Sequence, residues 1–427
     1  MGKERVARVT LWGGTAGYAW WDRKKSSAVF QYDPEFLKSG HDISPLMMPL
    51  APRPYRFGSL NRETFNGLPG ALSDSLPDSY GNTLIDLWIA ENNIRKVDFT
   101  PLDRLCYIGK RGIGALEYEP VLGDAYDGEI DVNRLSILAA DVLRLREGSD
   151  LDLTEGGLHE LLSIGTSAGG ARAKAVIGVN GAGDIRSGQA DLPDGYSHWL
   201  IKFDTEQEGA DKTGYCRIEH AYHEMAKDCG IDMTECRLLE IGTKAHFMTK
   251  RFDRIGNEKV HCQTLCAMAH YDFKVPGKHS YEGMLSIMRR LRIPYADQEQ
   301  AFRRMVFNVV MRNQDDHAKN FSFLLRKDGG WRLSPAYDMT YAFDPANYWT
   351  HRHQMSIGGK LQDITKKDLT AFAHEMNIRD ADGIIDAVVS VAAEWMSYAS
   401  SSGVPEKVAE KIDRVLLKDV RSGPARL

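Results

Sequence analysis

The sequence predicts an α+β fold in which a strand-rich N-terminal region is followed by a helical C-terminal lobe. Before residue 260, stretches such as RVARVTLWGG near the start and ALEYEPVL at 115–122 alternate as strands do. After residue 260, apolar residues recur at helical spacing instead, as in YEGMLSIMRRLRI and QAFRRMVFNVVMRN. A chain of 427 residues is too long for one ordinary core, so two or three domains or lobes are expected.

Three segments follow from this pattern: a strand-rich N-terminal domain at 1–150, a small lobe at 151–260 and a helical large lobe at 261–427. The first boundary comes after an amphipathic helix expected at 131–145, where Asp131 is the N-terminal cap. The stretch REGSDLDLTEGG that follows is acidic and contains glycine, which is typical of a linker.

Composition excludes several classes of protein. Hydrophobic residues at 43% with 26% charged residues describe a globular protein, and a net charge of -5 argues against binding nucleic acid over the whole surface. No apolar run approaches the length of a membrane span, and Gly13 and Gly14 interrupt the first apolar stretch, so no signal peptide is expected. The six cysteines are scattered, which suits reduced thiols in a cytoplasm.

The stretch NQDDHAKNFSFLL at 313–325 carries the most specific chemical signal. A stripe of apolar residues at helical spacing precedes it: Phe302, Met305, Val306, Val309 and Val310. Asn313 is expected to end that helix. The strand 321–325, the turn RKDGG and the returning strand WRLSP form a hairpin, which brings Asp338 back to the end where Asp315 and Asn320 lie.

Phosphoryl transfer in protein kinases uses such a set of groups. One aspartate orients the acceptor hydroxyl, while an asparagine five residues later and a second aspartate hold magnesium on the phosphates. Asp315 is therefore a candidate catalytic residue, and Asn320 and Asp338 are candidate magnesium ligands. A polar loop that needs no metal explains the loop alone equally well.

Upstream stretches fit the same chemistry. SIGTSAGGARAKAVIGV at 163–179 is a small-residue loop before an apolar strand, and its glycines would let backbone N–H groups approach phosphate, although an ordinary turn is the alternative. In SHWLIKFD, Lys202 lies on the strand face opposite Ile201 and could reach phosphates, or simply be solvated. Glu219, near the start of a predicted helix, could pair with Lys202 or interact only with the helix dipole.

HCQTLCAMAH offers a different reading. Cys262, Cys266 and His270 recur every four residues, so on a helix they would share one face and could bind zinc. Zinc sites usually draw ligands from more than one segment, and cysteine is a common core residue, so the core reading is favoured.

Over nearly its whole length the sequence resembles the HipA family of bacterial toxin kinases, which has an atypical protein-kinase-like two-lobed fold. SPLMMPL, FNGLPGALSDSLPDSYGNTLID and GKRGIGALEYEP are similar to the N-terminal region of that family. SAGGARAK, which has an extra glycine, KRFDR, NQDDHAKNFSFLL and LSPAYDM resemble its kinase motifs. DDHAKN followed by AYD is highly specific.

The resemblance implies a serine/threonine protein kinase that uses ATP and Mg²⁺. It implies that Asp315 is catalytic together with His317, and that Ser167 is a site of self-inactivating autophosphorylation. Asn320 and Asp338 match the magnesium ligands, and Lys250 to Phe252 fall where the hinge meets adenine. The implied ATP-binding residues are Ser167, Ala168, Gly169, Gly170, Ala171, Lys202, Lys250, Phe252, His317 and Asp338.

The resemblance also implies partners: a small helix-turn-helix, HipB-like antitoxin through which alone DNA is bound, and a protein substrate such as an aminoacyl-tRNA synthetase. Two other functions remain open. A small-molecule kinase shares the Asp-x4-Asn logic, but the family-like N-terminal region argues against it. A catalytically silent co-repressor would not need to keep Lys202, Asp315, Asn320 and Asp338. A metal-dependent phosphohydrolase is disfavoured because the usual order of His before Asp is absent.

Overall fold

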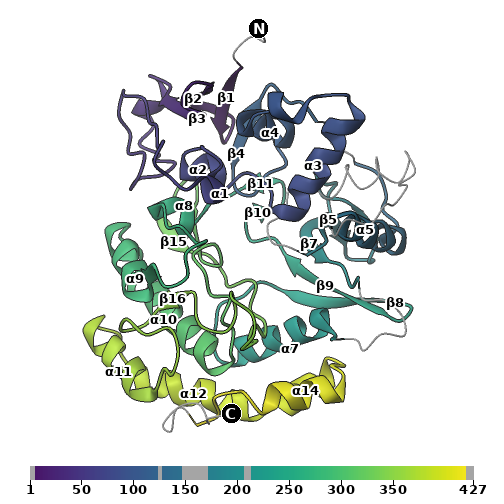
Figure 1. The fold of residues 1–427 in the computed structure, drawn as a ribbon, viewed down its shortest axis with the longest axis vertical. Coiled ribbons are helices and arrows are strands. Elements are labelled where there is room, and N and C mark those ends of the chain that lie inside the picture. The colour runs from purple at the N-terminus through teal and green to yellow at the C-terminus, as the bar shows by residue number, and fades with distance from the viewer. Residues whose placement is uncertain (1–4, 124–126, 147–171, 206–212, 420–427) are drawn as a thin grey trace. The chain divides into compact units, whose positions relative to one another are not determined.

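The computed structural model describes residues 5–123, 127–146, 172–205 and 213–419 (Figure 1). The chain divides into two compact units. The first unit comprises Met1–Thr205, Glu240–Gln263 and Ala267–His270, and the second comprises Glu206–Leu239, Thr264–Cys266 and Tyr271–Leu427. The strands gather early in the chain and helices dominate its end, which confirms the predicted fold class. The boundary near residue 150 lies outside the described residues and stays a prediction.

The N-terminal part of the first unit is a four-stranded antiparallel sheet with helices packed on it. Its elements are β1 (Val6–Leu11), β2 (Gly14–Asp22), β3 (Ser27–Tyr32), η1 (Phe36–Lys38), α1 (Arg62–Phe65), α2 (Gly70–Ser73), α3 (Ser79–Glu91), η2 (Lys96–Asp98), α4 (Pro101–Ile108), β4 (Leu116–Glu119) and α5 (Val132–Arg146). The strand order is β3-β2-β1-β4. Strands β1 and β4 and helix α5 confirm the expected elements at these positions.

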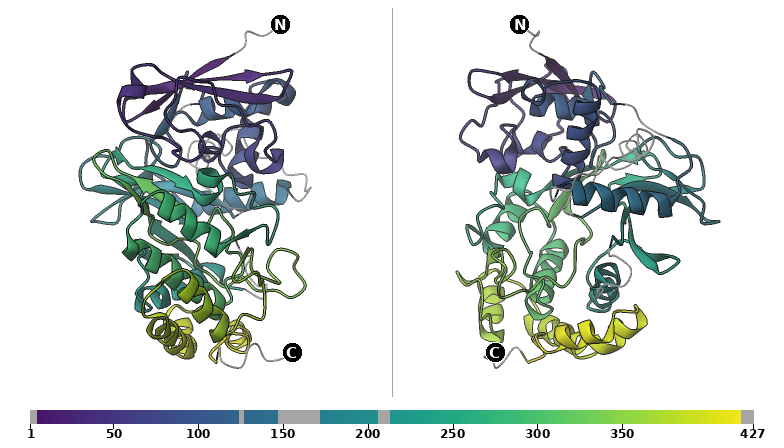
Figure 2. Two further views of the ribbon diagram at one scale, coloured as in Figure 1. Left: turned by 90° about the vertical axis from the view of Figure 1, so that its left-hand side faces the viewer. Right: turned by 45° about the vertical axis from the view of Figure 1, so that its right-hand side comes forward.

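Alternation in β1 buries Ala7, Val9 and Leu11, as the strand period requires. These side chains share one apolar cluster with residues of α2 and α4, which cover this sheet (Figure 2). Helix α4 was not predicted. It begins with a capping box, in which Thr100 accepts from the Asp103 N–H and the Asp103 carboxylate accepts from the Thr100 N–H.

The rest of the first unit contains four strands of a second, five-stranded sheet, which lie in the order β6-β5-β7-β9. Its elements, with the small strands after it, are β5 (Lys174–Asn180), β6 (Ile185–Ser187), β7 (Tyr196–Lys202), β9 (Lys244–Lys250), β10 (Arg254–Ile255), β11 (Glu258–Lys259) and β12 (His261–Thr264). Strands β5 and β7 are antiparallel, and Lys174 of β5 stands directly opposite Lys202 of β7.

The second unit is mainly helical. Its elements, including those that cross its boundary, are α7 (Tyr215–Asp228), β8 (Cys236–Ile241), α8 (Leu265–Ala269), β13 (His279–Ser280), α9 (Tyr281–Arg290), α10 (Tyr295–Val310), β14 (Ser322–Leu325), β15 (Trp331–Leu333), β16 (Met355–Ser356), α11 (Lys366–Glu375), α12 (Ala381–Ala393), α13 (Trp395–Ser401) and α14 (Glu406–Asp413). Tyr222 of α7 connects three of the helices, because its ring packs 5.9 Å from Phe307 of α10 and 5.5 Å from Trp395 of α13.

Two expectations about this unit have different outcomes. The hairpin is confirmed, since β14 and β15 are antiparallel with Phe323 opposite Leu333. The expected end of the preceding helix at Asn313 is wrong: α10 ends at Val310, because Arg312 adopts a positive φ of 54° that a right-handed helix cannot contain.

The cysteines and the hydropathy of the helices complete the description. All six cysteines are buried and free. Among the described residues, no helix combines the length and apolar character needed to cross a bilayer.

Candidate active site

The loop 315–320 lies in the second unit between α10 and β14, where the sequence places it. The five-residue spacing closes this loop on itself. The Asn320 side-chain N–H donates to the Asp315 carbonyl at 2.7 Å, and the Asn320 backbone N–H donates to the His317 carbonyl at 2.9 Å. Because Asn320 donates through its amide nitrogen, its amide oxygen remains the atom that could bind a hard cation.

The second carboxylate is brought to this loop by the residue before it. The Tyr337 hydroxyl donates to the Lys319 carbonyl at 2.6 Å and lies 2.5 Å from the Ser322 hydroxyl. Asp338 follows with a φ of 51°, a region that non-glycine residues rarely occupy and that recurs at functional sites. The structure thus places Asp315, Asn320 and Asp338 in one neighbourhood.

Electrostatics in this neighbourhood favour a bound cation. The side chain of Asp315 is 48% exposed, and His317 Nε2 lies 3.8 Å from its carboxylate. The pKa of Asp315 is raised, chiefly by partial burial and then by the negative charges of Asp338 and Asp316, against the opposing effect of His317. Carboxylates that raise one another's pKa gain from a shared positive charge.

Sequence reasoning missed Asp316. It is fully buried and accepts hydrogen bonds from the Tyr281 hydroxyl at 2.7 Å, from His353 Nδ1 at 2.9 Å and from the Gln354 N–H at 2.7 Å. Burial alone would raise the pKa of Asp316, but His353 and these hydrogen bonds lower it. Asp316 thereby fastens the loop 315–320 to segments near 281 and 353. The doubled aspartate in DDH is its sequence signal, but its partners are distant in sequence.

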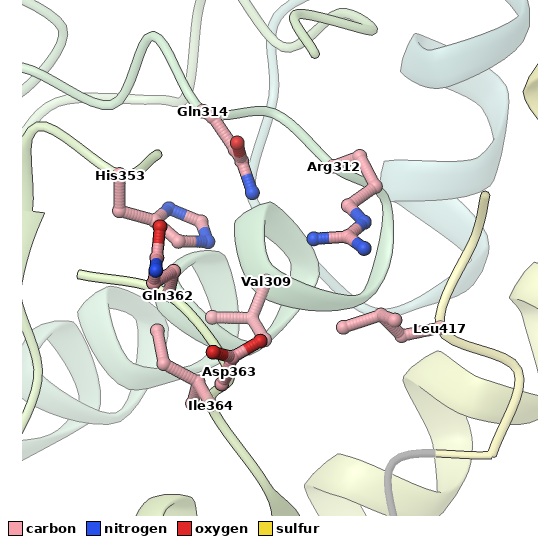
Figure 3. Close-up of a pocket in the computed structure, with 8 residues that line it drawn as sticks. All are labelled: Val309, Arg312, Gln314, His353, Gln362, Asp363, Ile364 and Leu417. Atoms are coloured by element: carbon pink, nitrogen blue, oxygen red, sulfur yellow. The ribbon is translucent and has the colours of Figure 1, made fainter. Parts of the chain in front are cut away.

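A small pocket lies behind the same loop (Figure 3). It is lined by Val309, Arg312, Gln314, His353, Gln362, Asp363, Ile364 and Leu417. Its cavity volume of about 10 Å³ is far below the ~300–1,000 Å³ typical of ligand sites. Gln314 and His353 are among the side chains that line it (Figure 3). We therefore assign it to the support of the loop and not to nucleotide binding.

The predicted phosphate lysine belongs to the first unit. Lys202 is 8% exposed, so it is not the solvated strand lysine of the alternative reading. Its ammonium lies 5.7 Å from the Phe247 ring centroid. The opposing Lys174 is buried as well and pairs with Asp78 at 3.0 Å. Glu219 is buried in the second unit, and its pairing with Lys202 stays a prediction.

The predicted adenine-binding segment ends β9. Lys250 is exposed and Phe252 is half-buried. Asp253, which follows them, is buried and forms ion pairs with Arg251 at 2.7 Å and Arg254 at 2.8 Å. Asp253 also accepts from the Gly114 N–H at 2.8 Å, so the N-terminal part of the unit is bonded to this segment.

Two other sequence hypotheses have separate outcomes. Ser167, Ala168, Gly169, Gly170 and Ala171 lie outside the described residues, so their roles stay predictions. The helical face proposed for zinc does not form, because Cys262 lies in strand β12 and α8 begins only at Leu265. Within the described part of the chain, no group of three His, Cys, Asp or Glu side chains could hold a metal.

Family models match both halves of the chain. One described as the HipA-like C-terminal domain matches residues 166–396, and one described as the HipA N-terminal domain matches residues 7–119. The HipA protein in a complex from Shewanella oneidensis MR-1 with HipB and operator DNA has a similar fold. The TM-score is 0.65 with 17% identity, over 95% of this chain and 94% of that one.

Two curated relatives are similar over shorter stretches. A protein of Sinorhizobium fredii named putative kinase Y4dM is 24% identical over 236 residues, which is 50% of this chain and 56% of the relative. A Haemophilus influenzae protein named putative kinase is 31% identical over 135 residues, 28% of this chain and 39% of the relative. The matches therefore span less than two thirds of either relative.

Proposed function

The chain belongs to the HipA family, and on this premise we propose that it is an ATP- and Mg²⁺-dependent serine/threonine protein kinase, the toxin of a type II toxin–antitoxin pair. The observation that carries the proposal is the closed loop 315–320 with Asp338 held beside it through Tyr337. Asp315 would accept the proton of the acceptor hydroxyl, and its raised pKa makes it a better base than an ordinary carboxylate.

The donor atoms fit Mg²⁺. The Asn320 amide oxygen and the Asp338 carboxylate are the hard oxygen ligands that this cation prefers, and the negative charges of Asp315 and Asp338 favour it. When bound, Mg²⁺ neutralises charge on the transferring phosphate. In the first unit, Lys202 would bind phosphate, while Lys250 and Phe252 would meet adenine and the loop 167–171 would cover the phosphates.

Calorimetry with Mg-ATP tests the site. Asp338→Ala deletes a direct magnesium ligand, so magnesium-dependent nucleotide binding should be lost. Asp344→Ala is the matched control, because it removes an exposed carboxylate from the same unit. Unchanged Mg-ATP affinity in Asp338→Ala would show that the site is assigned wrongly.

Autophosphorylation of Ser167 would switch the kinase off. A phosphate adds roughly -1.5 to -2 charges where ATP already places negative charge, and the loop could not keep its N–H groups on the nucleotide. Incubation with Mg-ATP, intact-mass measurement and peptide mapping should find modified Ser167 and lost ATP binding. Complete self-inactivation of Ser167→Ala would instead point to Ser163 or Thr166.

The proposed partners are a HipB-like antitoxin, which alone would contact DNA, and a translation component such as an aminoacyl-tRNA synthetase, all in the cytoplasm. The isolated chain should show no salt-sensitive operator binding, consistent with its net charge of -5. The second candidate function, a silent co-repressor, is distinguished by Asp315→Asn. If repression with the antitoxin is the whole function, that variant should be fully functional in cells.

A further inference from the structure

A group of aromatic rings and lysines forms a surface of the second unit next to the loop 315–320. It consists of Phe273, Lys274, Lys319, Tyr348 and Trp349, and we call it the aromatic–lysine surface. The ammonium of Lys274 lies 5.4 Å from the Phe273 centroid and 5.8 Å from that of Trp349. The ammonium of Lys319 lies 5.1 Å from the Phe273 centroid. Both lysines therefore use the same ring.

The surface is continuous with the candidate catalytic residue. The Phe273 and His317 rings are 5.1 Å apart, and His317 Nε2 is 3.8 Å from the Asp315 carboxylate. Outward from Phe273, Lys274 leads to Trp349, whose ring is 5.0 Å from that of Tyr348. A chain of contacts thus runs from Asp315 to the exposed aromatic residues.

The segment that presents Tyr348 and Trp349 is fixed relative to the loop 315–320. The Gln354 side chain donates to the Trp349 carbonyl, and the Gln354 N–H donates to buried Asp316 at 2.7 Å. The Gln354 carbonyl accepts from the Gly277 N–H at 2.8 Å, which holds the turn after Lys274. Gln354 therefore joins both halves of the surface to Asp316, the residue next to Asp315.

The exposed rings and lysines of this surface are suited to binding another protein segment. Tyr348 is 61% exposed and Trp349 is 40% exposed, so two large rings face solvent side by side. Aromatic side chains are enriched where proteins bind one another. Within the described part of the chain, neither Lys274 nor Lys319 has an ion-pair partner, although the chain as a whole carries a net charge of -5. The surface therefore offers apolar area and unneutralised positive charge together.

We propose that the aromatic–lysine surface binds the protein segment that carries the acceptor hydroxyl, and that this segment is acidic with an apolar residue among its acids. The inference rests on the proposed function. A peptide lying across Phe273 with its hydroxyl at Asp315 passes the ammonium groups of Lys274 and Lys319, which favour carboxylates beside the acceptor. Its apolar side chain packs on Trp349 and Tyr348.

The test uses the full chain, Mg-ATP and a degenerate peptide library with a central serine or threonine, in which one flanking position at a time is fixed. Asp or Glu should exceed Lys or Arg by about fivefold at the positions near Lys274, as for a well-formed exposed ion pair. Lys274→Glu should reverse this preference, and Trp349→Ala should remove the preference for an apolar residue. Lys327→Glu, an exposed lysine in the β14–β15 turn, is the matched control.

The outcomes distinguish a failure of the proposed function from a failure of the proposed substrate preference. If the wild-type chain neither binds Mg-ATP nor transfers phosphate, the proposed function fails. If it phosphorylates peptides but Lys274→Glu keeps the wild-type preference, or basic flanks are preferred, the inference alone fails. Salt-sensitive binding of a labelled single-stranded U12 RNA that Trp349→Ala abolishes would assign the surface to nucleic acid and also overturn it.

Discussion

In the second unit the candidate catalytic groups lie between residues 315 and 338, and hydrogen bonds within this stretch hold them in place. The Asn320 side chain donates to the Asp315 carbonyl, and the Tyr337 hydroxyl donates to the Lys319 carbonyl. In the first unit the residues expected to bind nucleotide depend on remote partners. Lys174, opposite Lys202, pairs with Asp78, which is 96 positions away. Asp253, beside Phe252, accepts from Gly114, which is 139 positions away.

The difference is that the candidate groups of the second unit are placed to act on a substrate, whereas those of the first unit also hold the fold together. In the second unit the polar groups that would act on substrate are half-exposed, and only their support, such as Asp316, is buried. In the first unit Lys174, Lys202 and Asp253 are themselves buried. The ion pair of Lys174 with Asp78 and the hydrogen bond from the Gly114 N–H to Asp253 connect the N-terminal part to the rest of the unit. Substitutions in the second unit should therefore change rates, and those in the first unit should change stability as well.

The largest effect is expected at Asp315. Asp315→Asn keeps the shape of the side chain and the carbonyl that Asn320 uses, so folding and ATP binding should survive. Loss of the base should lower phosphoryl transfer by about 10²–10⁴-fold, the usual contribution of general base catalysis. Single-turnover transfer of labelled phosphate, with ATP affinity measured in parallel, checks this. Near-normal transfer by a folded Asp315→Asn protein would contradict the role.

Asp253→Asn tests the opposite behaviour in the first unit. Burial alone would raise the pKa of Asp253, but Arg251, Arg254 and the Gly114 N–H hold it well below its usual range, so the carboxylate is charged at any ordinary pH. Its removal leaves two buried guanidinium groups without their shared partner and should cost about 3–5 kcal/mol of unfolding free energy.

Asp22→Asn is the control for this variant. Asp22 pairs with Arg56 in the same unit, but both side chains are partly exposed, at 24% and 28%. In urea unfolding, Asp22→Asn should lose much less unfolding free energy than Asp253→Asn, because solvent screens an exposed ion pair. Equal losses in Asp22→Asn and Asp253→Asn would mean that the buried cluster has no special part in holding the first unit.

The same contrast explains what the sequence could predict. The hairpin β14–β15 and the convergence on the loop 315–320 follow from patterns within about thirty positions, and both are found in the structure. The partners of Asp316 are 35 and 37 positions away, at Tyr281 and His353, and no local pattern names them. Helix α4 could have been predicted, because Thr100 and Asp103 form a capping box at its start that is recognisable from the sequence.

Gly114→Ala tests whether close packing of the N-terminal part at Gly114 fixes the position of the segment near Asp253. Gly114 has a φ of +76°, and an added Cβ would lie 2.9 Å from the Cys262 backbone nitrogen. Gly13 has a similar φ of +81° with nothing within 4 Å, so Gly13→Ala carries the left-handed strain without the clash.

Both variants should lose the ~1–2 kcal/mol of a left-handed alanine, and Gly114→Ala should lose a further ~1–3 kcal/mol through overpacking. In Gly114→Ala the segment that includes Phe252 should shift, and ATP should then bind more weakly. Urea unfolding and calorimetry measure the two effects. If the two alanine variants lose the same unfolding free energy and bind ATP equally well, packing at Gly114 does not affect the expected adenine site.

The smallest effect concerns acid sensitivity. Four histidines of the first unit, His198, His246, His261 and the partly buried His270, have their pKa lowered to about 4, mainly by desolvation. In the second unit the same holds for His223 and His279. Each resists protonation more when folded than when unfolded. The stability that each contributes is therefore present above the unfolded pKa and is lost as the pH falls from there toward 4.

His270 isolates one such contribution. Its Nε2 accepts from the Gly70 N–H at 3.1 Å between the rings of Phe57 and Phe65, so it must be neutral there. Between pH 7.5 and 6 it should account for less than about 1 kcal/mol of the stability lost.

His270→Gln keeps an acceptor for Gly70, so unfolding free energy measured at both pH values should show a shallower slope than the wild type. His374→Gln replaces an exposed histidine of the second unit and should keep the wild-type slope. A wild-type slope in His270→Gln, or an imidazole NMR titration near pH 6.5 in the folded chain, would show that His270 is not held neutral by the first unit.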